Sequence, residues 1–140
     1  MNQGEVVLTF ELPHAPKKVW RALTEPDLLA RWLMKTDLQP TVGHEFRFTR
    51  EPLPHWDGVV NCQILEVDEP RFISYTWRAL GVDTVVSFTL EATSTGTRLR
   101  LGQTGFEASH KQAIGGARSG WKHMAGEALF KVLAELGDES

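Results

Sequence analysis

Hydrophobic and polar residues alternate along much of the chain, beginning close to its N-terminus. In residues 5–12 the side chains of Val6, Leu8, Phe10 and Leu12 fall on one face, and mainly polar residues occupy the other. A period of two residues is typical of a strand that buries one face. These residues therefore predict the first strand of a sheet.

Two short helices are expected after this strand. Pro16 suits the first position of a helix, because its missing N–H would have no partner there, and apolar residues then recur at helical spacing in residues 19–23. Thr24 suits the N-cap of a second helix that carries Pro26 in its first turn. We expect the two helices to form a V that closes one edge of the sheet.

Strand patterns then follow one another through residues 42–106, separated by short turns such as 94–96. Because short turns can join only antiparallel neighbours, the sheet is predicted to be antiparallel. Residues 59–67 are apolar on both faces, which indicates a strand that is covered on both sides or bent by a bulge. The predicted inward positions include Phe46, Phe48, Tyr75, Trp77, Val86, Phe88, Leu101 and Gln103.

The C-terminal segment carries the clearest helical pattern of the chain. Its apolar residues recur at steps of three and four: Trp121, Met124, Ala125, Ala128, Leu129, Val132, Leu133 and Leu136. The pattern extends back to Ile114, but Gly115, Gly116 and Gly120 weaken a helix there, so a kink or a separate first turn is possible. Ala125 and Ala128 either leave space against the sheet or allow close packing.

The order of elements predicts an α+β fold in one domain, residues 1–140. An apolar sheet face and an apolar helix stripe must be buried against each other. We therefore expect a curved antiparallel sheet of about six or seven strands, wrapped around a long C-terminal helix, with two short helices after the first strand.

Composition and charge narrow the classes of partner. The chain has 140 residues, of which 41% are hydrophobic and 24% are charged. Its net charge is -3, so its electrostatics do not favour nucleic acid or an anionic membrane as a partner. Cys62 is the only cysteine, which excludes an internal disulfide and points to a reducing compartment. The N-terminus lacks a signal-peptide pattern and no apolar run reaches roughly 18 residues, so we expect a cytoplasmic protein without a membrane span.

Motifs for catalysis are not evident. The five histidines and Cys62 lack metal-ligand spacing, and no metal or cofactor is expected. Residues 116–120 lack the glycine that a nucleophile elbow places two residues before its serine. Asp83 and Glu91 are predicted to face solvent, so no carboxylate pair is placed for acid–base work.

Three residues have two open interpretations. Gln103 and Tyr75 are expected on the inner face of the sheet, where each side chain either satisfies its hydrogen bonds internally or orients a ligand. Trp56 lies in a proline-rich loop and either caps the mouth of a cavity or folds back onto the sheet.

Several segments in order resemble the START-like (SRPBCC) superfamily. The resemblance is closest to the branch named after the C-terminal domain of the heat-shock chaperone ATPase activator, and it covers nearly the whole chain. The segments are 16–33 (PKKVWRALTEPDLLARWL), 43–46 (GHEF), 57–60 (DGVV), 69–77 (EPRFISYTW), 86–90 (VSFTL), 96–99 (GTRL), 104–106 (TGF) and 120–121 (GW).

This resemblance implies a helix-grip fold with a cavity between the sheet and the long helix, and binding of a hydrophobic small molecule or lipid. Two features depart from the family pattern. Family members often have a histidine where this chain has Gln103. The eukaryotic activator also has a separate N-terminal domain, whereas this chain begins at the first strand, so chaperone activation is a poor inference from the family name.

We therefore expect the protein to bind an apolar small molecule or lipid as a monomer or homodimer, and prefer this function to catalysis. A cyclase or hydrolase that uses the same pocket, and a protein-interaction or stress-response module, are the alternatives. The expected ligand-binding residues are Phe46, Phe48, Trp56, Cys62, Tyr75, Trp77, Val86, Phe88, Leu101, Gln103, Trp121, Met124 and Ala125.

Overall fold

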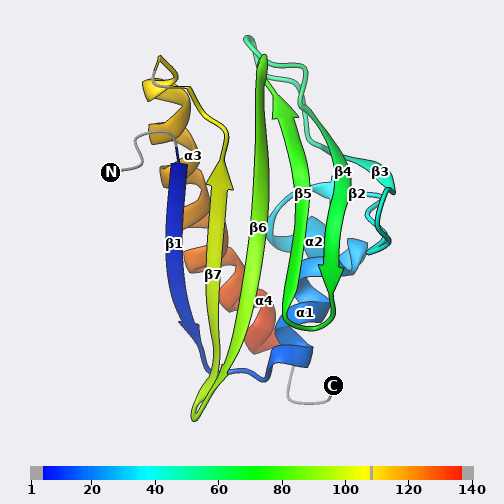
Figure 1. The fold of residues 1–140 in the computed structure, drawn as a ribbon, viewed down its shortest axis with the longest axis vertical. Coiled ribbons are helices and arrows are strands. Elements are labelled where there is room, and N and C mark those ends of the chain that lie inside the picture. Colours follow the sequence, from blue (N-terminus) through cyan, green and yellow to red (C-terminus); the bar gives the residue numbers. More distant parts are fainter. Residues whose placement is uncertain (1–4, 108, 137–140) are drawn as a thin grey trace.

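A curved antiparallel sheet surrounds the C-terminal helix in the computed structural model, which describes residues 5–107 and 109–136 (Figure 1). The sheet has seven strands in the order β1-β7-β6-β5-β4-β3-β2. The strands are β1 (Glu5–Leu12), β2 (Lys35–Thr36), β3 (Glu45–Thr49), β4 (Val59–Asp68), β5 (Phe72–Ala79), β6 (Val82–Thr93) and β7 (Gly96–Thr104). The predicted α+β helix-grip fold is confirmed.

The sheet alternates buried and exposed residues as the sequence pattern predicts. In β7, Leu99 and Leu101 are buried, whereas Arg98 and Arg100 between them are exposed. β1 pairs with β7 so that Leu8 lies opposite Leu101, which places the first strand at one edge of the sheet. Each strand from β2 to β6 pairs with the next strand in sequence, and the chain crosses from β1 at one edge to β2 at the other through its two short helices.

A bulge explains why β4 is apolar on both faces. The register between β4 and β5 shifts between Ile64 and Glu66. Ile64 is buried, whereas Leu65 is exposed, so the second apolar set is not covered by another layer. Of the two interpretations, the bend is the one that the structure contains.

The two short helices are α1 (Pro16–Thr24) and α2 (Pro26–Trp32). Their boundary corrects one expectation: Thr24 is the last residue of α1, and its hydroxyl donates to the carbonyl of Trp20 at 2.8 Å. Glu25 precedes α2 as its N-cap residue, and Pro26 takes the first helical position. The indole of Trp32 donates to the carbonyl of Ala22 at 2.8 Å, which fixes α2 against α1.

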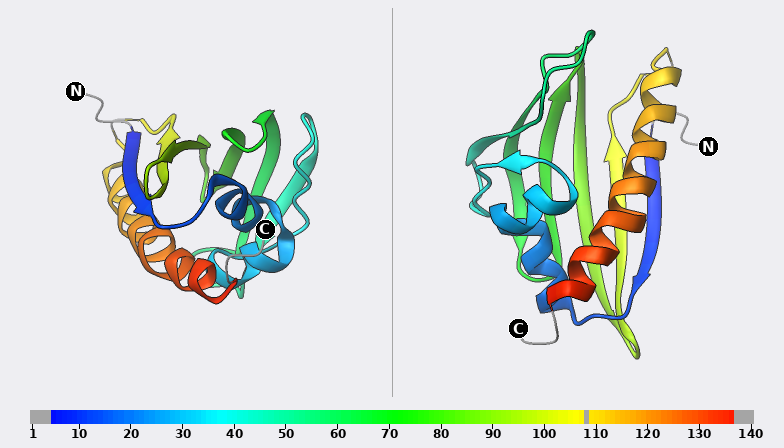
Figure 2. Two further views of the ribbon diagram at one scale, coloured as in Figure 1. Left: turned by 90° about the horizontal axis from the view of Figure 1, so that it is seen from below. Right: turned by 180° about the vertical axis from the view of Figure 1, so that it is seen from behind.

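The C-terminal helix consists of α3 (Lys111–His123), the π-helical turn η1 (Met124–Ala128) and α4 (Leu129–Leu136). The irregularity therefore lies after the glycines rather than at them, since α3 runs through all three. Figure 2 shows the helix crossing the concave side of the sheet diagonally, from the β1 edge at its start to α1 and α2 at its end. An ion pair between Arg31 and Glu135 joins α2 to α4.

This diagonal path divides the concave side into two parts. Around α4, the short helices and the sheet enclose a core that includes Leu29, Phe88, Leu129 and Leu133. Around α3, no second helix of the described residues covers the sheet (Figure 2). Within the described residues, no helix has both the length and the hydrophobicity needed to cross a membrane.

Candidate functional site

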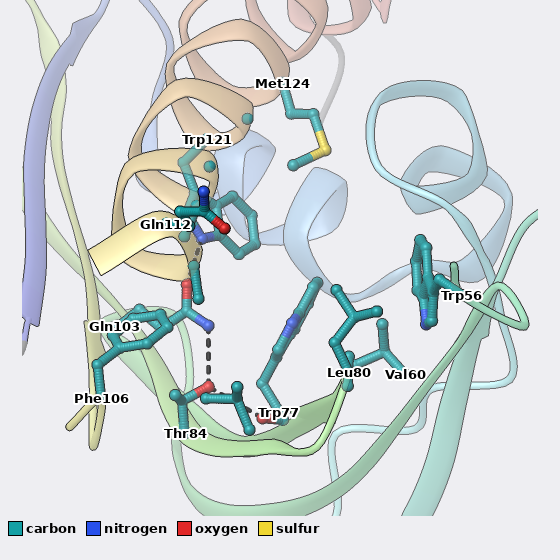
Figure 3. A pocket seen from close by; sticks show the side chains of 16 residues that line it. Trp56, Val60, Trp77, Leu80, Thr84, Gln103, Phe106, Gln112, Trp121 and Met124 are labelled. Atoms are coloured by element: carbon teal, nitrogen blue, oxygen red, sulfur yellow. Dashed lines mark hydrogen bonds between the residues drawn. The ribbon is translucent and has the colours of Figure 1, made fainter. Parts of the chain in front are cut away.

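A cavity of about 290 Å³ lies between α3 and the strands β4 to β7, at the end of the sheet where α3 begins (Figure 3). It opens to solvent beside exposed residues of α3 and of the turn between β5 and β6. The described lining residues are Trp56, Val60, Trp77, Ala79, Leu80, Val82, Thr84, Gln103, Phe106, Gln112, Ala113, Gly116, Ala117, Gly120, Trp121 and Met124.

Aromatic rings form much of the wall. Trp77 of β5 and Trp121 of α3 lie with their ring centroids 5.2 Å apart. Trp56 enters from the loop between β3 and β4, where its indole donates to the carbonyl of Val59 at 3.1 Å. Figure 3 shows Trp56, Trp77 and Trp121 around the same space, although they come from three distant parts of the chain. The cavity is therefore suited to a flat, apolar molecule.

Small residues form the helical side of the cavity. Ala113, Gly116, Ala117 and Gly120 recur at the spacing of one helix face. A Cβ atom added to Gly116 would meet nothing within 4 Å. Glycine destabilises a helix by about 1 kcal/mol relative to alanine. On this face its absent side chain leaves the space that a larger residue would fill.

A chain of hydrogen bonds forms the polar part of the wall (Figure 3). The indole N–H of Trp121 donates to Oε1 of Gln103 at 2.8 Å. Nε2 of Gln103 donates to the hydroxyl of Thr84 at 2.8 Å, and that hydroxyl donates to the carbonyl of Trp77 at 2.9 Å. Gln103 is thus held at both ends of its amide, and its internal hydrogen bonds account for its burial.

The lining has no ionisable side chain. Among its sixteen described residues only Thr84, Gln103 and Gln112 carry a hydroxyl or an amide, and the rest are apolar or glycine. Across residues 5–107 and 109–136, no group of three or more His, Cys, Asp or Glu side chains could hold a metal ion. The cavity can therefore bind through apolar contact and neutral hydrogen bonds.

The structure brings five of the expected site residues to this cavity. They are Trp56, Trp77, Gln103, Trp121 and Met124. The position of Trp56 along the cavity agrees with the interpretation that this residue caps the cavity mouth.

The other eight expected residues do not line this cavity and belong to the packed core: Phe46, Phe48, Cys62, Tyr75, Val86, Phe88, Leu101 and Ala125. Phe88 lies 6.0 Å from Trp121 and 6.5 Å from Trp32, measured between ring centroids, so rings fill the space above it. Ala125 is fully buried, so close packing, and not space against the sheet, is its role.

Two buried acidic groups in this core have raised pKa values. Burial raises the pKa of the Cys62 thiol, with a smaller effect from the charge of Asp37. Burial also raises the pKa of the Tyr75 hydroxyl well above its ordinary value, with a smaller effect from Cys62. Both groups are therefore protonated at neutral pH and unsuited to act as a nucleophile or base.

The sequence interpretation missed most of the helical and hairpin side of the cavity, including Leu80, Thr84, Phe106 and Gly116. One signal was present, because glycines at positions 116 and 120 interrupt an otherwise helical pattern. Glycine at these positions of the helix leaves the space beside it unfilled. Leu80 and Phe106 lie beyond strand ends, where the alternating pattern predicts nothing.

Comparison with protein families places this arrangement in a known group. The model of the family described as "Activator of Hsp90 ATPase homolog 1-like protein" matches residues 13–134. Among proteins with curated functions, none matches the chain.

Solved structures share the fold over most of the chain. Protein MLL2253 from Mesorhizobium loti is 40% identical with a TM-score of 0.88, over 94% of this chain and 97% of the other. Protein NE0264 from Nitrosomonas europaea is 21% identical with a TM-score of 0.80, over 96% of each chain. DynU16, a putative protein in the dynemicin biosynthetic locus, is 21% identical with a TM-score of 0.80, over 96% of this chain and 49% of the other.

Proposed function

The chain belongs to the family of activator of Hsp90 ATPase homolog 1-like proteins, and we propose that it binds an uncharged, apolar small molecule in the cavity between α3 and the sheet. The observation that carries this proposal is the lining itself. Sixteen described residues surround the space and none of them is ionisable.

The volume of the cavity limits the size of its ligand. An engineered apolar cavity of about 150 Å³ binds benzene. The cavity here measures about 290 Å³, which corresponds to a molecule of about two fused rings. Because the cavity is open beside Leu80, substituents of a larger molecule can extend into solvent.

The lack of charge in the lining favours a neutral ligand. A buried sulfonate or carboxylate without a cationic partner loses much of its hydration and is strongly disfavoured. Thr84 and Gln103 already hydrogen-bond within the protein, so apolar burial at roughly 25 cal/mol per Å² is the main source of affinity.

Binding is supported over the alternatives by two further observations. A cyclase or hydrolase needs an acid or base in its pocket, and the side chains that line this cavity offer none. A partner surface needs a contiguous apolar patch. The exposed large apolar residues of the described chain lie apart, on β1, β4 and two turns: Val7, Val42, Leu65 and Leu80.

A matched pair of fluorescent probes tests the proposal. N-phenyl-1-naphthylamine is neutral, and 1-anilinonaphthalene-8-sulfonate adds one sulfonate to the same rings. We expect the neutral probe to bind with a blue-shifted emission and the sulfonate to bind at least tenfold more weakly, because its charge has no partner. If neither probe binds saturably, the proposal is wrong.

Two glycines provide the matched variants. Gly116 lines the cavity, whereas its neighbour Gly115 does not, and an added Cβ meets nothing within 4 Å at either position. Gly116→Phe is expected to fill the cavity and abolish binding of the neutral probe, while Gly115→Phe leaves it unchanged. Equal binding by both variants would place the probe elsewhere.

A further inference from the structure

The amide of Gln103 has one hydrogen-bond donor more than the wall of the cavity uses. Gln103 lines the cavity and is 3% exposed. A side-chain amide carries two N–H donors and one acceptor oxygen. The oxygen accepts from Trp121, and one N–H donates to Thr84. Among residues 5–107 and 109–136, no hydrogen bond uses the second N–H.

The neighbours of this amide fix its orientation. An indole N–H can only donate, so Trp121 requires the oxygen of Gln103 rather than its nitrogen. The hydroxyl of Thr84 donates its single hydrogen to the carbonyl of Trp77, so towards Gln103 it can only accept. A flipped amide would lose both of its hydrogen bonds. The second N–H of Gln103 is therefore held in a fixed direction before any ligand binds.

This second N–H faces the cavity. Because an amide group is planar, the hydrogen bond to Thr84 also sets the direction of the other N–H. Figure 3 shows Thr84 on one side of the amide nitrogen and, beside that nitrogen, the open space of the cavity between Trp77 and Trp121. A ligand that fills this space meets an oriented donor in a lining that is otherwise mostly apolar.

The unused donor restricts the ligand more than the unused lone pairs beside it do. The oxygen of Gln103 and the hydroxyl of Thr84 each accept one hydrogen bond, and each keeps a second lone pair. Buried oxygens with a single hydrogen bond are common in folded proteins, whereas buried N–H groups without an acceptor are rare. A purely hydrocarbon ligand would displace water from the second N–H and leave it unpaired, at a cost in affinity.

We propose that Gln103 donates its second amide N–H to an acceptor oxygen of the ligand, such as that of an aromatic ketone. This inference rests on the proposed function and gives the ligand one polar feature. The ligand is a neutral ring system that carries a carbonyl oxygen at its buried end. Apolar area supplies most of the affinity, and Gln103 is the specificity-determining residue that distinguishes molecules of similar size and shape.

Two ligands of nearly equal shape test the inference. 2-Acetylnaphthalene carries a ketone, and 2-isopropenylnaphthalene replaces the ketone oxygen by a CH₂ group. The affinity of each is measured by displacement of N-phenyl-1-naphthylamine. Comparing the two ligands in the wild-type protein and in a variant of Gln103 removes their difference in hydrophobicity, because that difference is the same in both proteins.

Gln103→His is the variant that isolates the extra donor. A neutral imidazole has one acceptor nitrogen and one N–H, so it can replace both hydrogen bonds of Gln103 within the wall but has no further donor. The titrations are done at pH 8, above the ordinary histidine pKa of about 6.5. We expect the variant to bind the ketone roughly two- to tenfold more weakly, as loss of one neutral hydrogen bond implies, and to bind the alkene equally well.

A spectroscopic measurement on the wild-type protein observes the donor directly. After ¹⁵N labelling, the two side-chain amide protons of Gln103 give separate NMR signals. The proton that is not bonded to Thr84 is expected to shift downfield when 2-acetylnaphthalene binds and to move much less with 2-isopropenylnaphthalene. Both ligands carry the same rings, so ring-current effects largely cancel in this comparison. A histidine variant that misfolded would affect the titrations but not this measurement.

The outcomes separate the two proposals. If N-phenyl-1-naphthylamine and both ligands fail to bind, the proposed function is wrong. If they bind but Gln103→His weakens both ligands equally or neither, the role of Gln103 is wrong and the proposed function stands. An equal response of the second amide proton to the ketone and to the alkene would lead to the same conclusion.

Discussion

The indole of Trp121 and the amide of Gln103 form a buried hydrogen bond that joins α3 to β7, with 2.8 Å between Nε1 and Oε1. Gln103 continues through Thr84 of β6 to the backbone of β5, so one side chain connects the helix with three adjacent strands. An amide donates and accepts at the same time and does not titrate. Glutamine is therefore well suited to hold this wall of the cavity in place at any pH.

Replacing Gln103 by leucine is expected to lower the free energy of unfolding by about 1–3 kcal/mol, because the buried N–H of Trp121 loses its acceptor. Urea unfolding followed by far-UV circular dichroism measures the change. Trp121→Phe in the same chain removes the orphaned donor, so the double variant should lose less than the sum of the single variants. Strictly additive losses would show that the two side chains are not coupled.

Leu80 adds apolar area to the rim of the cavity, and its backbone conformation is expected to lower the stability of the folded protein. It occupies the first position of a two-residue turn between Ala79 and Val82, with φ of 57°, and Gly81 follows with φ of 75°. Positive φ at both positions is typical of a type I′ turn, which prefers Asn-Gly. Leu80 is also 59% exposed and lines the cavity.

Leu80→Asn should therefore raise the free energy of unfolding by about 1 kcal/mol, as expected for relief of a left-handed conformation. The same variant should bind N-phenyl-1-naphthylamine more weakly, because the rim loses apolar area. Thermal unfolding and probe titration measure the two effects. Val42→Asn is the control, since Val42 is 63% exposed and does not line the cavity. A stabilised variant with unchanged binding would remove Leu80 from the site.

Alkaline pH should destabilise the protein through Cys62 and Tyr75. Their ordinary pKa values are 9.0 and 10.0, and burial raises the pKa of each in the folded chain. Well below pH 9 both groups are protonated in the folded and unfolded states and contribute no pH dependence. Above these values the unfolded chain loses protons that the folded chain keeps, so the free energy of unfolding falls by up to about 1.4 kcal/mol per pH unit for each group.

Urea unfolding between pH 8 and 11 measures this slope. Cys62→Ala is expected to remove the part that begins near pH 9, and Tyr75→Phe the part that begins near pH 10. The comparison between variants cancels the titration of lysines, which occurs in the same range. Identical slopes in all three proteins would show that these two groups ionise as freely in the folded chain as in the unfolded one.

The sequence by itself determined the fold and the inward faces of the strands. Alternation is a local property, because successive side chains of a strand point to opposite faces whatever the rest of the chain does. It correctly assigned Tyr75, Trp77, Leu101 and Gln103 to one side of the sheet. The ordered motifs identified the family because they mark strands, turns and helix starts, which are also local features of the sequence.

Only the tertiary structure decided which inward side chains meet open space and which meet each other. That outcome depends on how the helix packs on the sheet: Ala125 is fully buried, whereas Gly116 lines the cavity and a Cβ atom added there would meet nothing within 4 Å. Phe88 and Trp77 follow the same alternating pattern, yet one is covered by rings of α2 and α3 while the other lines the cavity. Crossing angles and contacts between distant elements are properties of the packed chain, and no local period in the sequence encodes them.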